Sequence, residues 1–203
     1  DEFVDDTVLN NVFNELDFMD ADGKFMEVAQ QKMTGYRYDR IVWLNYESLD
    51  REKQPGLLSL MKLMISVPFE LNKKCNLYLQ ASSSFQLAVY PPKAFYKRHV
   101  DGGYDDLNNG RKITAVFYAN KSWSSQDGGQ LRVYKRRLNP YQVAKLADGE
   151  AGEAGKAPDA QDMTIEEEIE PQGGRIVLFR SRDIPHEVLP CRRKRFAISL
   201  WMA

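Results

Sequence analysis

Residues that bind metals or form crosslinks are scarce in this sequence. Its 203 residues include only two cysteines and two histidines. Cys75 and Cys191 lie far apart and form no cluster of the kind that binds zinc. Two thiols could form one disulfide, but so low a count is more typical of a reducing compartment. We therefore expect a cytoplasmic protein, with the nucleus as a second location.

The sequence also lacks long apolar runs and a net charge of either sign. No apolar run approaches the roughly 20 residues of a membrane-spanning helix. No signal peptide is visible, although a chain that begins at Asp1 leaves a preceding targeting segment open. A formal net charge of -1 gives no general attraction to nucleic acid or to an anionic membrane. We expect a monomer with neither partner, folded as a single domain over residues 1–203.

Two segments have the apolar period of a helix. Residues 2–18 carry apolar side chains every four positions and predict a helix that packs on the core. A second helix is expected to begin at Pro55 and Gly56, to bury leucines and methionines, and to end or kink at Pro68. We assign both helices to a supporting region of about residues 1–75.

Short strand-like runs dominate the remainder of the chain. Residues 36–46 are rich in aromatic and β-branched residues and predict the first strand. Further runs, separated by Gly and Pro, lie at residues 84–90, 94–100, 112–120, 129–135, 174–180, 185–190 and 194–202. Helices followed by many short strands predict an α+β, mainly β protein, a helix-backed sandwich with its core at about 76–203.

One long segment, at about residues 138–171, interrupts this series of strands. Its middle is rich in Ala, Gly and Glu and has little to bury, so we expect it to be mobile. It is either a tolerated surface insertion or a flap that contacts a partner, and the sequence leaves both open.

The two histidines and one aspartate have the spacing of a metal site. His99 and Asp101 are two residues apart, and residues i and i+2 of a strand point to the same face. His186 could complete the set from a neighbouring strand. Two histidines and one carboxylate form the facial triad of non-haem iron oxygenases, which leaves positions open for other ligands. Catalytic zinc and a chance spacing are the alternatives.

An arginine near the end of the chain favours iron over zinc. Arg195 follows His186 by nine positions and shares a strand face with Ala197 and Ser199. A buried guanidinium is unfavourable unless it pairs with an anion. A dicarboxylate co-substrate would supply that anion in a bidentate geometry, whereas a hydrolytic zinc site gives Arg195 no role.

Four segments carry a resemblance to a known family. They are Tyr38–Trp43, Val89–Asp101, Ile113–Arg132 and Pro185–Trp201. In these segments the chain resembles the 2-oxoglutarate- and Fe(II)-dependent prolyl 4-hydroxylases of the cytoplasmic oxygen-sensing type. The resemblance covers most of residues 36–202, and it implies a double-stranded β-helix, or jelly roll.

The resemblance also implies a role for each candidate residue. His99, Asp101 and His186 would bind Fe(II). The 2-oxoglutarate site would comprise Arg195, Tyr118, Tyr90 and Ser199. The substrate contacts would be Tyr96, Arg111, Trp201, Arg37 and Asp39, the last two in a mobile loop that closes over the substrate. As alternatives, Tyr90 and Trp201 are ordinary strand aromatics, and Asp39 pairs with Arg37 or Arg40 at the surface.

The activity that the resemblance implies is the 4-hydroxylation of a proline in an intracellular protein, as part of oxygen sensing. The substrates in this family are hypoxia-inducible factor in animals and a Skp-type ubiquitin-ligase adaptor in some protists. The co-substrates are 2-oxoglutarate and O2, and ascorbate is a candidate reductant. Alternatives are a ribosomal protein or translation factor as substrate, and a catalytically silent iron- or 2-oxoglutarate-binding module.

Three departures from the family put the substrate's identity in doubt while leaving the candidate site residues in place. The spacing from Asp101 to Arg111 is slightly longer than in the animal enzymes, and the insertion at 138–171 is much longer. The chain also ends at Ala203, so we expect the C-terminal helix of the animal enzymes to be absent or removed.

Overall fold

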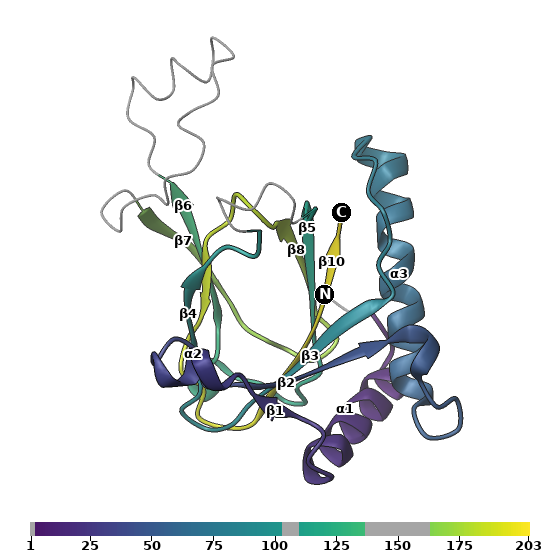
Figure 1. The fold of residues 1–203 in the computed structure, drawn as a ribbon, viewed down its shortest axis with the longest axis horizontal. Helices are drawn as coiled ribbons and strands as arrows, with labels where there is room; N and C mark the ends of the chain where they lie inside the picture. Colours follow the sequence, from purple (N-terminus) through teal and green to yellow (C-terminus); the bar gives the residue numbers. More distant parts are fainter. Residues whose placement is uncertain (1–2, 103–109, 137–162) are drawn as a thin grey trace.

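The protein has two packed antiparallel sheets backed by helices (Figure 1). This computed structural model describes residues 3–102, 110–136 and 163–203. One sheet contains β1 Met26–Glu27, β2 Arg40–Asn45, β3 Ser84–Tyr90, β5 Ile113–Tyr118, β8 Ile176–Arg180 and β10 Arg195–Met202. The other contains β4 Tyr96–His99, β6 Leu131–Arg136, β7 Met163–Ile169 and β9 His186–Val188. The strand orders are β1-β2-β3-β10-β5-β8 and β4-β9-β6-β7, which confirms the mainly β, jelly-roll fold.

The helices are α1 Asp6–Ala21, α2 Ala29–Met33 and α3 Pro55–Cys75, with 3-10 turns η1 Tyr46–Ser48 and η2 Ser125–Asp127. The two long helices, α1 and α3, lie on the face of the six-stranded sheet that points away from the four-stranded sheet, whereas α2 lies near β4 (Figure 1). The short elements β1 and α2 both lie in the polar stretch before Gly35. In the part of the chain that the structure describes, no helix has the length and apolar character needed to cross a membrane.

A capping residue, a glutamate and a glycine determine how the two long helices begin and how they pack against each other. The side chain of Asp5 caps α1 by accepting a hydrogen bond from the Val8 nitrogen at 2.8 Å. From α1, the carboxylate of Glu15 accepts hydrogen bonds from the backbone nitrogens of Gly56 and Leu57, both at 2.7 Å. A Cβ at Gly56 would lie 2.6 Å from the Val12 nitrogen, so glycine permits the close approach of α1 and α3.

Of the two outcomes expected at Pro68, an end or a kink, the structure excludes the end. Helix α3 continues through it to Cys75 and is capped by Asn76 in the left-handed conformation, with φ 53°. A proline inside a helix removes one backbone hydrogen bond. The helix nevertheless continues because its apolar face, which includes Leu60 and Met64, is buried on the sheet.

Side chains alternate between two environments along the strands of the six-stranded sheet. On β10, Phe196, Ile198 and Leu200 belong to the apolar core beneath the helices. Ala88 and Tyr90 of β3 belong instead to a second core, between the two sheets, together with Leu131 and Val188 of the four-stranded sheet. Alternation thus gives this sheet one face for the helices and one for the interior of the jelly roll.

The segment expected as an insertion contains a strand. Residues 163–169 form β7, which pairs with β6 and places Leu131 opposite Ile169. The expected mobile part, at residues 138–162, lies outside the described residues. The end of the segment differs in composition from its Ala/Gly/Glu-rich middle. Its apolar residues Met163, Ile165 and Ile169 favour a strand.

Candidate functional site: a His–Asp–His cluster beside a buried arginine

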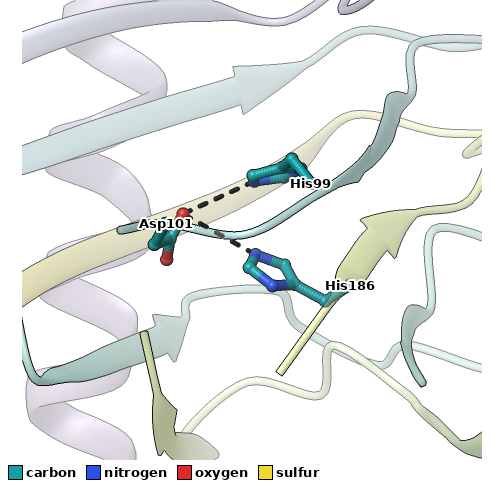
Figure 2. Close-up of side chains that lie close together, drawn as sticks. All are labelled: His99, Asp101 and His186. Carbon is teal, nitrogen blue, oxygen red and sulfur yellow. Dashed lines mark ion pairs between the residues drawn. The ribbon is translucent and has the colours of Figure 1, made fainter. Parts of the chain in front are cut away.

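Three side chains that could bind a metal converge at one end of the jelly roll (Figure 2). The Nε2 atoms of His99 and His186 lie 3.4 Å and 3.8 Å from Oδ1 of Asp101. One donor atom from each residue lies within 4.8 Å of the others. The structure therefore brings together the three residues that the sequence nominated, in an arrangement suited to a single metal ion.

Backbone carbonyl groups orient both imidazole rings. Nδ1 of His99 lies 2.8 Å from the Lys97 oxygen, and Nδ1 of His186 lies 3.0 Å from the Ile184 oxygen. A carbonyl oxygen only accepts, so each Nδ1 carries a proton, and in the neutral form of each ring the lone pair of Nε2 is available to a metal ion. Burial and the neighbouring His99 lower the pKa of His186 to about 4, which keeps this ligand neutral at neutral pH.

Asp101 reaches the cluster by a different route from the one expected. Strand β4 ends at His99, so the two residues do not share a strand as the spacing suggested. The backbone nitrogens of Asp101 and Gly102 both donate to the Ser181 oxygen, at 3.0 Å and 3.1 Å. Burial opposes ionisation of Asp101, but the His99 hydrogen bond and both imidazoles hold its pKa well below its ordinary value.

Arg195 and Tyr118 lie side by side in the same interior, beyond the cluster. Both are fully buried, and Nη1 of Arg195 and the hydroxyl of Tyr118 have no hydrogen-bond partner. Nε of Arg195 donates to the Gly129 oxygen at 3.0 Å, and the guanidinium lies 4.8 Å from the centre of the Tyr90 ring. Among the described residues no carboxylate pairs with Arg195 at salt-bridge distance.

These unpaired groups fit a small dicarboxylate. An uncompensated buried charge destabilises a protein by several kcal/mol, roughly 3–5 where one partner of a buried pair is removed. Two small side chains line the cavity beside Arg195, because Ala197 and Ala88 lie opposite each other in the sheet. A carboxylate entering this space would accept from Arg195 and Tyr118 together.

One cavity connects most of the candidate residues. It is lined by the three cluster residues and by Arg195, Tyr118, Tyr90, Ser199, Tyr96 and Trp201. The structure thus places nine of the twelve nominated residues around a single space. The other three, Arg111, Arg37 and Asp39, lie just behind or beside its walls.

The ion pair of Arg37 and Asp39 is buried, which contradicts the alternative of a surface pair. Their side chains are 6% and 0% exposed, and Nε of Arg37 donates to Oδ1 of Asp39 at 2.6 Å. The guanidinium lies 4.2 Å from the centre of the Tyr96 ring, which stacks on His99 at 3.8 Å. The strand register shifts between Tyr96 and His99, and the two rings stack although the residues are three positions apart. Arg37 therefore reaches the cluster through the Tyr96 ring.

Aromatic residues and an arginine form one end of the cavity wall. The Arg111 guanidinium lies 4.2 Å from the centre of the Trp201 ring, and its Nη1 donates to the backbone carbonyl oxygen of Asp101 at 3.1 Å. Trp43 of β2, 47% exposed, packs against Trp201 with ring centroids 5.5 Å apart. The sequence analysis assigned no role to Trp43, although it named Trp201 as a substrate contact.

Sequence reasoning missed several residues of the cavity. Its unassigned lining comprises Gln86, Ala88, Val116, Leu131, Val188 and Ala197. Most of these lie two or four positions from a nominated residue on the same strand. The alternation of side chains along a strand could therefore have identified them, since residues two positions apart share a face.

Comparison with known proteins agrees with this geometry. Residues 85–203 match the model of the 2OG-Fe(II) oxygenase superfamily. The chain is 34% identical over 187 residues to the hypoxia-inducible factor prolyl hydroxylase of Caenorhabditis elegans, covering 88% of this chain and 22% of that protein. It is 29% identical over 189 residues to human Egl nine homolog 1, covering 89% and 36%. The chain therefore spans well under half the length of these two relatives.

Solved structures of related proteins have the same fold. A prolyl-4-hydroxylase from Pseudomonas putida superposes with a TM-score of 0.73 at 26% identity, over 99% of this chain and 88% of that one. A Trichoplax adhaerens prolyl hydroxylase, in complex with a peptide fragment of the hypoxia-inducible factor oxygen degradation domain, gives 0.72 at 25% identity, over 100% and 80%. With its His–Asp–His cluster, its buried arginine and this family match, the chain belongs to the 2OG-Fe(II) oxygenase superfamily.

Proposed function

We propose that this chain is an Fe(II)- and 2-oxoglutarate-dependent prolyl 4-hydroxylase that acts on a proline of another protein. The observation that carries the proposal is the placement of two unpartnered buried groups, Nη1 of Arg195 and the Tyr118 hydroxyl, in the cavity that the His–Asp–His cluster lines. A metal site alone would fit many reactions. A metal site with an unpaired cation beside it calls for an anionic co-substrate.

In this proposal His99, Asp101 and His186 hold Fe(II). Bound iron supplies the redox chemistry by which O2 and 2-oxoglutarate become succinate and CO2 while one oxygen atom enters a C–H bond of the substrate. The chain's own residues bind and orient. Three ligand atoms on one side leave the other side of the ion available to the co-substrates.

Arg195 and Tyr118 bind the distal carboxylate of 2-oxoglutarate. The guanidinium and the hydroxyl each have a free donor, and Arg195 Nε is already anchored by the Gly129 oxygen. Tyr90 covers the guanidinium with its ring, and Ser199 lines the same wall. Burial of this pocket excludes water, which strengthens the ion pair between Arg195 and the carboxylate.

The substrate proline enters past Trp201, Arg111 and Tyr96. Trp201 and Tyr96 line the cavity, and Arg111 stacks on Trp201 beside the Asp101 carbonyl. Partly exposed aromatic rings are suited to a proline ring and its apolar neighbours. The Arg37–Asp39 pair supports Tyr96 from behind, so its role is to hold the substrate wall in place.

We infer that the substrate is an intracellular regulatory protein of the hypoxia-inducible factor type or a Skp-type ubiquitin-ligase adaptor, in an oxygen-sensing role in the cytoplasm or nucleus. Support comes from relatives named as hypoxia-inducible factor prolyl hydroxylases and from the peptide bound to the Trichoplax protein. A ribosomal protein or translation factor is the competing substrate class, and it would meet the same residues at the cavity.

The reaction is tested with purified protein, Fe(II), 2-oxoglutarate, ascorbate and proline-containing peptides from each substrate class. We expect succinate release that depends on one of the peptides, and a peptide heavier by one oxygen atom in mass spectrometry. Asp101→Ala should abolish both signals, whereas Asp50→Ala, which removes a carboxylate in a distant turn, should leave them unchanged. Turnover that survives Asp101→Ala would contradict the proposed iron site.

A catalytically silent binding module is the second candidate, and the same experiment separates it from an enzyme. Such a module would bind 2-oxoglutarate through Arg195, measurable by calorimetry with Mn²⁺ in place of iron, yet release no succinate with any peptide. The complete metal cluster beside Arg195 favours the enzyme, because binding alone requires no open coordination positions.

A further inference from the structure

A hydrogen-bonded pair of hydroxyl groups lies behind Asp101, on the side away from the histidines. Oγ1 of Thr114 on β5 lies 2.8 Å from Oδ2 of Asp101. Oγ of Ser181, just beyond the end of β8, lies 2.9 Å from Oγ1 of Thr114. Both hydroxyl residues are fully buried. No contact with the candidate iron or co-substrate explains their presence.

The direction of these hydrogen bonds follows from the charge of Asp101. A carboxylate that binds a metal is ionised and only accepts, and Oδ2 of Asp101 is the acceptor in its hydrogen bond with Thr114. Thr114 must therefore give its one hydroxyl proton to Oδ2. Because Thr114 has no second proton, Ser181 must donate to Thr114, so the chain of donors runs from Ser181 through Thr114 to Asp101.

Ser181 also holds the backbone of the same residue. Its carbonyl oxygen accepts from the nitrogens of Asp101 and Gly102, and its own nitrogen donates to the Lys112 oxygen at 2.9 Å. Ser181 thus reaches the backbone of Asp101 directly and its carboxylate through Thr114. Asp101 lies beyond the end of its strand, where the β-ladder no longer fixes it.

We propose that Thr114 and Ser181 are positioning residues that make Asp101 present a single oxygen, Oδ1, to the metal. Thr114 occupies Oδ2, while Oδ1 faces both Nε2 atoms. Without this restraint the carboxylate could rotate or chelate the ion through both oxygens, taking a position that the co-substrates need. The proposal rests on the proposed iron site, but it does not require that the substrate be a proline.

The test measures Co²⁺ and Mn²⁺ binding by calorimetry, together with the visible spectrum of bound Co²⁺. Thr114→Val keeps the shape of the side chain but removes the donor, and should weaken metal binding about tenfold and change the spectrum. Thr114→Ser keeps the hydroxyl and should bind metal within about twofold of the unmodified protein, with an unchanged spectrum. This rescue separates a hydrogen-bonding role from a packing role.

Ser181→Ala tests whether the two hydroxyls act as one device. Alone it should weaken metal binding about threefold, because Thr114 can still donate but is no longer oriented. In the Thr114→Val background it should have no further effect, since the donor through which it acts is gone. Additive losses would show independent roles and overturn the proposed relay.

A control variant excludes a general effect of destabilisation. Asp5→Ala removes the hydrogen bond that caps α1, a helix on the other face of the six-stranded sheet, and should leave the Co²⁺ affinity and spectrum unchanged. Asp101→Ala shows how much Co²⁺ binding remains when the metal site is removed. If Asp101→Ala and the unmodified protein bind Co²⁺ equally, the iron site itself fails. If the unmodified protein alone binds and Thr114→Val matches it, only the positioning role fails.

Discussion

The two faces of the six-stranded sheet use the same strands for opposite purposes. Toward the helices, alternate residues are large and apolar, and side chains such as Phe117 and Ile198 are completely buried. Toward the four-stranded sheet, the neighbours of those residues are alanine, serine, tyrosine and arginine around a cavity. Stability therefore comes mainly from one face, which leaves the other free to keep unpaired polar groups for a ligand.

Truncation on the helix face should have the largest effect on stability. Phe117→Ala should lower the free energy of unfolding by about 3–5 kcal/mol, because it removes a buried aromatic ring and leaves a cavity. Urea denaturation of the metal-free protein measures this. Ser199→Ala, on the other face of β10, should change the same quantity by less than about 0.5 kcal/mol. Equal losses would show that the two faces are not specialised.

Removing the charge on the cavity face should have the reverse profile. Arg195→Met should weaken 2-oxoglutarate binding by about 2–5 kcal/mol, which is roughly 30-fold or more. The free energy of unfolding should stay equal or rise, because the lost guanidinium is buried without a counter-charge. Arg193→Met, at a half-exposed arginine, serves as the control in calorimetry. A stability loss without a binding loss would mean that Arg195 is structural.

Adding a metal should stabilise the cavity face specifically. Mn²⁺ at about 100 times its dissociation constant should add about 2.7 kcal/mol to the free energy of unfolding. The increase should disappear in Asp101→Ala and persist in Phe117→Ala, if that variant is folded at the temperature of the measurement. Thermal unfolding with and without Mn²⁺ decides this. An equal increase in Asp101→Ala would place the ion elsewhere.

Removal of one hydroxyl should have the smallest effect of the four. Tyr118→Phe should weaken 2-oxoglutarate binding by about 1.5 kcal/mol, roughly tenfold, because one hydrogen bond to a carboxylate is lost. Stability should not change, since the hydroxyl has no partner in the structure. Tyr134→Phe removes a hydroxyl that bonds to Glu187 and should leave binding unchanged, which makes it the matched control.

Much of this arrangement could be predicted because strands alternate. The period of two placed Arg195, Ala197 and Ser199 on one face, and the structure has them around one cavity. The histidines were identifiable because the sequence has only two. The period failed where strands are irregular: the register shifts between Tyr96 and His99, and Asp101 lies beyond the end of β4.

Other features depend on contacts that no local pattern contains. The burial of Asp39 depends on Arg37 and on Tyr96, which is far away in the sequence, so the sequence left a surface pair open as an alternative. The continuation of α3 through Pro68 depends on packing against the sheet. The Thr114–Ser181 hydrogen bond joins residues 67 positions apart. Such features require the tertiary structure because their partners meet only on folding.

The three metal-binding residues are held by both sheets, which affects how easily the strands around the site separate locally. His99 and His186 are register partners on β4 and β9, whereas Asp101 is held by Ser181 at the end of the other sheet. An ion bound to all three would link the two sheets at the candidate metal site. Metal occupancy would then slow the local separation of these strands, so that amide hydrogen exchange near the site would report whether the metal is bound.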